Sequence, residues 1–161
     1  MVDIREALLE VAETDNDTKI RSEAKSLATN ELGDFEFLMS IVIWYEVLTI
    51  VNMVSKQLQS KDMIIDIAIT QVKGILSYFE KYRDTGFSEA LVKAKEIAVE
   101  MNVDPVFPHR REIRRKKHFD ESVDDTLPLS VEESFRVKYF LYIVDKIIVS
   151  LNKRFKQYQT S

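Results

Sequence analysis

The sequence predicts an all-α fold, a bundle of about five to six helices with one long charged loop at about 103–129. Apolar residues recur at spacings of three and four along most of the 161 residues, which is the period of an α-helix. The chain has only three glycines and three prolines, which are too few for the many tight turns of a β-sandwich or a β-barrel. The chain has no cysteine, but its length suffices for one core without disulfides, so we expect a single domain over 1–161.

The N-terminal third is expected to hold two short helices, at about 3–13 and 17–29, because a polar run separates two apolar stripes. Asp17 ends that run and can cap the second helix. Asp34 should cap a long helix at about 35–59, whose apolar residues cover most of its circumference. A helix that is apolar all round has to be surrounded by other helices.

The middle of the chain predicts two further helices, at about 63–83 and 88–102. Gly86 is expected to close the first of them, and Ser88 can cap the second. Pro105 and Pro108 should end the second helix, and the charged loop follows.

The last helix is predicted at about 130–158 and should be a principal part of the core, because its apolar spacing persists for about 20 residues. Ser130 and Glu133 form the S-x-x-E pattern of a capping box, in which each side chain accepts from the other residue's backbone N–H.

Aromatic residues in the long helices are interpreted as core residues rather than as the lining of a ligand pocket, since core packing is their commoner use. They are Trp44, Tyr78, Phe79, Tyr82 and Phe87. The stretch 37–54 could also span a membrane by its length. Glu46 near its middle makes insertion costly, so a buried core helix explains the stretch better, and we expect no membrane contact.

Charge is distributed unevenly along the chain. The segment 109–119 holds six basic residues and one acid, so with a net charge of −4 for the whole chain the remainder carries −9. The acidic part repels nucleic acid, so any contact with DNA would have to use this segment. An alternative is a solvated loop, and another is a nuclear import signal. The candidate nucleic-acid-binding residues are Arg110, Arg111, Arg114, Arg115, Lys116 and Lys117.

Catalytic and cofactor sites are not predicted. His109 and His118 lie nine positions apart in the loop, with nothing to hold a tetrahedral metal site. Acid pairs such as Asp124 and Asp125 are not expected to act in catalysis, and Glu133 already has a capping role. We therefore expect no metal, no cofactor and no enzymatic activity.

Extended strings resemble a known family. They are ALLEVAET (7–14), SLATNELGDFEFLMSIVIWYEVL (26–48), VSKQLQSKDMIIDIAI (54–69), YRDTGFSEAL (82–91), DPVFPHRREIRRKKHFDE (104–121) and EESFRVKYFLYIVD (132–145). These strings are similar to hAT-transposase-derived proteins of the zinc finger MYM-type protein 1-like kind. The resemblance implies the helical part inserted into an RNase H-like catalytic domain. The acidic triad of that family lies in flanking segments, so no catalytic residue carries over.

Two functional hypotheses follow. One is a non-catalytic helical scaffold or interaction domain, built on the helices around Trp44 and Tyr139, which binds a protein partner or a second copy of itself. The other is a nucleic-acid-binding module acting through 110–117. The start of the chain resembles no signal peptide, because acidic and basic residues interrupt it. We expect an intracellular, nuclear protein.

Overall fold

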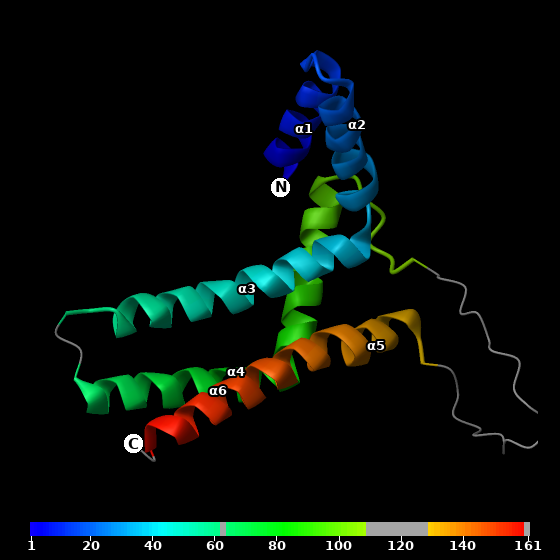
Figure 1. Ribbon diagram of the computed structural model, residues 1–161. Coiled ribbons are helices and arrows are strands. Elements are labelled where there is room, and N and C mark those ends of the chain that lie inside the picture. Colours follow the sequence, from blue (N-terminus) through cyan, green and yellow to red (C-terminus); the bar gives the residue numbers. More distant parts are fainter. Residues whose placement is uncertain (62–63, 109–128, 160–161) are drawn as a thin grey trace, which may run out of the picture.

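A computed structural model describes residues 1–61, 64–108 and 129–159 of the chain. Every regular element within these ranges is helical, so the all-α prediction is confirmed (Figure 1). The elements in order are α1 (Val2–Thr14), α2 (Thr18–Ser26), the π-helical η1 (Leu27–Glu31), α3 (Phe35–Leu58), α4 (Ile65–Glu100), α5 (Val131–Phe135), the π-helical η2 (Arg136–Leu141) and α6 (Tyr142–Gln159).

α2 and α3 begin within a residue of the predicted positions, because their caps are local. The Asp17 carboxylate accepts from the backbone N–H of Lys19 at 2.8 Å, and that of Asp34 accepts from Glu36 at 2.8 Å. Each aspartate thereby satisfies one of the free N–H groups of a helix start. α1 and α2 pair as a hairpin at one end of the molecule, beside the C-terminal end of α4 (Figure 1).

α4 corrects the prediction of two helices at 63–83 and 88–102, because it runs unbroken from Ile65 to Glu100. Gly86 does not close a helix: it is buried inside α4 and has a negative φ. α4 nevertheless changes direction near its middle (Figure 1). The segment there contains Gly86 and Ser88, the kind of pair at which helices bend. A Cβ at Gly86 would overlap the Tyr82 ring, so the glycine is needed for space.

α4 ends in a Schellman motif before the prolines are reached. Asn102 takes the left-handed conformation, with φ of 52°, and Val103 N–H donates to the carbonyl of Ala98 at 2.8 Å. Val103 and Phe107 are then buried in the core. The predicted loop at 103–129 therefore begins with core residues, and its part at 109–128 lies outside the described residues.

The last helix runs through α5, η2 and α6 without a break, close to the predicted 130–158. Ser130 accepts from the backbone N–H of Glu133 at 3.1 Å, which confirms one half of the capping box. The other half is wrong, because both Glu133 carboxylate oxygens accept from Arg136 instead. This ion pair lowers the pKa of the Glu133 carboxyl, chiefly through those hydrogen bonds.

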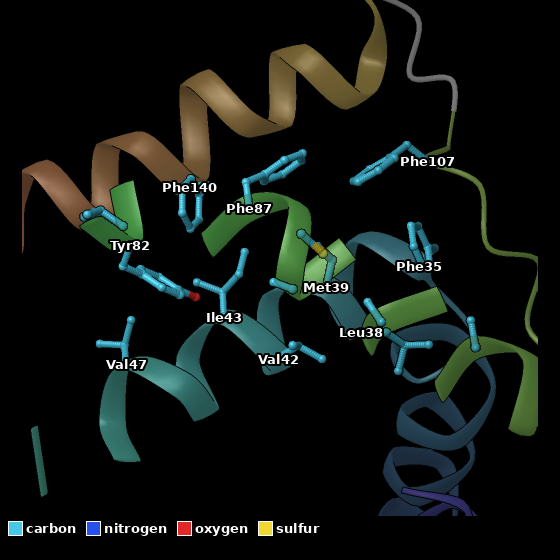
Figure 2. Packing of buried hydrophobic residues seen from close by; sticks show 14 of the residues in the cluster. Phe35, Leu38, Met39, Val42, Ile43, Val47, Tyr82, Phe87, Phe107 and Phe140 are labelled. Atoms are coloured by element: carbon cyan, nitrogen blue, oxygen red, sulfur yellow. The ribbon is translucent and has the colours of Figure 1, made fainter. Parts of the chain in front are cut away.

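The core lies where α3 and the last helix pack on the middle of α4. Phe140 and Val144 of the last helix are fully buried, as predicted for this helix. Phe140 contacts the rings of Tyr82 and Phe87, which stand on either side of Gly86 in α4 (Figure 2). The bend in α4 is therefore filled from the side of the last helix by one aromatic ring.

The two glycines of α4 offer a matched test of this packing. Gly86→Ala should destabilise the fold by about 1–3 kcal/mol, because the added methyl group has to displace the buried Tyr82 ring. Gly74→Ala should stabilise it by about 0.5–1 kcal/mol, since nothing lies within 4 Å of a Cβ there and alanine favours the helix. Urea unfolding midpoints measure both changes, and a stabilising Gly86→Ala would contradict the packing described.

Candidate interaction surface

α3 carries a second apolar face that the other helices leave exposed. Its packing is mainly on α4, through one side of the helix. On the other side Tyr45 is 72% exposed and Leu48 is 55% exposed. The prediction that α3 is surrounded by other helices is therefore wrong. We call the residues on this side the α3 face: Ile41, Trp44, Tyr45, Leu48, Val51, Asn52 and Ser55. Ile41 and Ser55 are half-buried, and the other five are exposed.

The α3 face carries no charged residue, and Glu46 is the only charged residue between Phe37 and Ser55. A shallow, open groove of about 480 Å³ lies along its C-terminal part. The groove is lined by Tyr45, Leu48, Thr49, Val51, Asn52 and Ser55. The arrangement can hold an apolar side chain from a partner, with short polar groups at its edge.

Trp44 belongs to the edge of this face, and its predicted place in the core is wrong. The side chain is 41% exposed, and its indole N–H donates to the Tyr139 hydroxyl at 3.1 Å. Indoles and phenols commonly lie with one polar end in water and the ring on apolar surface. Tyr78 is also partly exposed and stacks on Tyr82, whereas Phe79, Tyr82 and Phe87 are buried as predicted.

Glu46 fixes the rotation of α3 about its own axis. The Tyr82 hydroxyl donates to Glu46 Oε2 at 2.7 Å, and the Lys93 ammonium donates to Oε1. Tyr82 and Lys93 lie about three helical turns apart on α4, so one carboxylate joins two separate turns of that helix to α3. Leu48 is two residues further along α3 and points to nearly the opposite side. Holding Glu46 against α4 therefore keeps the α3 face toward solvent.

The pKa values of both donors to Glu46, Tyr82 and Lys93, are raised. Burial, followed by the hydrogen bond to Glu46, raises the pKa of the Tyr82 phenol well above its ordinary value of 10.0. The hydrogen bond to Glu46 raises the pKa of Lys93 above 10.5. Both groups consequently keep their protons in the folded chain at a pH where the unfolded chain releases them.

α3 is the one helix in the described ranges that is long and apolar enough to cross a membrane, with a third of its most apolar window buried. The same test accepts core helices of soluble proteins. Glu46 interrupts the apolar stretch, and its oxygens are bound by Tyr82 and Lys93 of α4. Insertion of α3 alone would break both contacts and carry an acid into the bilayer.

The sequence-predicted nucleic-acid residues fall in the undescribed part of the loop. They are Arg110, Arg111, Arg114, Arg115, Lys116 and Lys117, and His109, His118 and the acid pair Asp124 and Asp125 fall there as well. In the ranges that the structure describes, no group of three or more acidic or histidine side chains could hold a metal ion.

Comparison with known proteins adds no assignment: no protein-family model matches the chain, and no solved structure matches it.

Glu46, Tyr82 and Lys93 position the α3 face, and the sequence alone does not identify them as a set. Tyr82 and Lys93 lie 36 and 47 positions after Glu46 along the chain, so no short motif connects them. The sequence feature that points to this set is Glu46, the single acid in an otherwise uncharged stretch. An acid on a helix with two apolar faces needs a hydrogen-bonding or charged partner.

Tyr82→Phe should reduce the loss of stability at alkaline pH. The raised pKa of Tyr82 means that its contribution is fully present below pH 10 and falls as the pH rises above it. At pH 7 the variant should lose about 1–2 kcal/mol with its hydrogen bond to a carboxylate. Urea titrations between pH 7 and 11 measure this, with Tyr142→Phe, which is 59% exposed, as the control. Equal alkaline slopes for Tyr82→Phe and the wild type would contradict the assignment.

Proposed function

We propose that this chain is a non-catalytic helical scaffold that binds a partner through the α3 face. The observation that supports it is the uncharged apolar face on a helix whose opposite side already contributes to the core. Apolar patches of several hundred Å² on a soluble chain mark interaction sites. Trp44 and Tyr45 within the face belong to the residue types that dominate binding energy at interfaces.

Rigidity is a second support for this proposal. α3 is held against α4 by buried apolar residues from Phe35 to Val54 and by the Glu46 contacts. A preformed face loses little conformational entropy on binding, so more of the contact energy appears as affinity.

The resemblance to the helical insertion of hAT-transposase-derived proteins supports this proposal. If the chain derives from such an insertion, it retains the packing role of the insertion, and the catalytic residues belong to other segments. A nuclear location is part of the same proposal, and it rests on the resemblance and on the basic segment 109–119.

Dye binding tests the docking face directly. At about 1 µM chain, Leu48→Lys should lower the fluorescence of an apolar-surface dye by about half, because a charge then lies in the middle of the apolar patch. The control is Val92→Lys on α4, where the side chain is 58% exposed and lies outside the face. Equal dye fluorescence in the wild type and Leu48→Lys would contradict the proposal.

A second candidate function is nucleic-acid binding through Arg110, Arg111, Arg114, Arg115, Lys116 and Lys117, which the density of basic residues favours. If all six bind phosphates, the logarithm of the association constant for duplex DNA should fall with the logarithm of salt concentration at a slope of about −5. Fluorescence anisotropy measures this slope. The variant with all six residues changed to Ser should lose binding, and a flat salt dependence of the wild type would refute this function.

A further inference from the structure

We infer that the partner at the α3 face is a second copy of this chain, with the two α3 helices antiparallel and a twofold axis passing beside Leu48. The inference rests on the proposed function, because it names the occupant of the docking face.

The positions of the α3 face are symmetric about Leu48. They fall three, four and seven residues before it and three, four and seven residues after it. On an α-helix such positions form one continuous stripe. The N-terminal half of the stripe carries Ile41, Trp44 and Tyr45, and the C-terminal half carries Val51, Asn52 and Ser55.

The large side chains therefore lie on one half of the stripe and the small ones on the other. An antiparallel pair with its axis at Leu48 places each large half opposite the small half of the other copy. Residue 44 then meets 52, residue 45 meets 51, and residue 41 meets 55. The groove runs from Tyr45 to Ser55, and Val51, Asn52 and Ser55 of the small half line its C-terminal part, which is where the Tyr45 ring of the second copy would enter. A parallel pair would place large against large and leave both grooves empty.

Charge favours the same arrangement. The chain carries a net charge of −4, so two copies repel one another over most approaches. The α3 face has no charge, and Glu46 is turned toward α4, where Lys93 binds it. Two copies can consequently meet at this face without bringing like charges together.

The area of such a pair is that of a weak, transient contact. The α3 face spans residues 41–55, about 21 Å of helix, so pairing along it covers roughly 300 Å² of each copy, or about 600 Å² in total. Interfaces of this size are reversible, so we expect dissociation in the micromolar range. An isologous contact of this kind closes on itself and stops at a dimer.

Sedimentation equilibrium of the full chain from about 1 to 500 µM tests the pairing. The wild type should show a reversible monomer–dimer equilibrium. Leu48→Glu should raise the dissociation constant by about a hundredfold, because two carboxylates meet at the axis. Val92→Glu, at a site of matched exposure on α4, should behave like the wild type. Circular dichroism confirms that each variant is folded.

A mixing experiment tests whether position 48 lies at the twofold axis. Leu48→Glu and Leu48→Lys should each be monomeric, and an equimolar mixture of the two should recover the dimer, because position 48 of one copy meets position 48 of the other. A mixture of folded variants that stays monomeric overturns the inference.

Cysteine pairs test the direction of the helices, and the chain is suited to this because it has no cysteine of its own. Tyr45→Cys mixed with Val51→Cys should give a disulfide-linked heterodimer under mild oxidation, since antiparallel pairing brings these positions together. Tyr45→Cys alone should remain uncrosslinked. Crosslinking of Tyr45→Cys to itself in preference to the mixture overturns the antiparallel assignment. This readout also serves if a charged variant fails to fold.

Failure of self-pairing and failure of the docking face give different results. A wild type that is monomeric at the highest concentration, while dye binding still depends on Leu48, overturns the second copy as partner and leaves the proposed function standing. A monomer whose dye binding is independent of Leu48 overturns both. Leu48-dependent binding of a monomeric chain to phosphatidylcholine vesicles overturns the inference in favour of a lipid surface.

Discussion

The carboxylate of Glu46 is the contact on which the arrangement of the long helices depends. It accepts from Tyr82 and Lys93, which lie about three helical turns apart in the bent helix α4. A carboxylate that is mostly removed from water has to be paired, because an unpaired buried charge is costly. The rotation of α3 and the bend of α4 are therefore coupled, since a change in either would separate Glu46 from one of its donors. Phe140 fills the bend from the last helix and contacts Tyr82 from the other direction.

The features that could be predicted from the sequence are those whose cause is local. Asp17 and Asp34 cap their helices through backbone groups two residues away, so their identity and position suffice. The sequence predicts a helix end at Gly86 because a glycine near the end of an apolar stripe is typical of a helix end. Its actual role is to make room for the Tyr82 ring. That role depends on the rotamer of a neighbouring side chain and on the helices that bury it, which no local pattern encodes.

The docking face could be predicted only in part. The apolar circumference of the stretch 35–59 is visible in the sequence, but hydrophobicity alone does not say which side becomes core. Glu46 contributes to that choice through partners that lie in another helix. The sequence alone therefore predicts Trp44 in the core, although it lies at the edge of the exposed face. The candidate residues of the basic segment were found by charge density, which requires no knowledge of packing.

A helix with two apolar sides is a compromise between stability and solubility. The exposed apolar area of the α3 face contributes nothing to the folding of the single chain and raises the risk of unspecific association. The side chains of this face are graded in size along the helix, and they surround a groove of limited length. An ungraded stripe would pair in several registers, whereas a graded one fits its copy best in a single antiparallel register. In the antiparallel pair that we infer, the order of large and small residues about Leu48 would supply the specificity at a surface that has no charges with which to supply it.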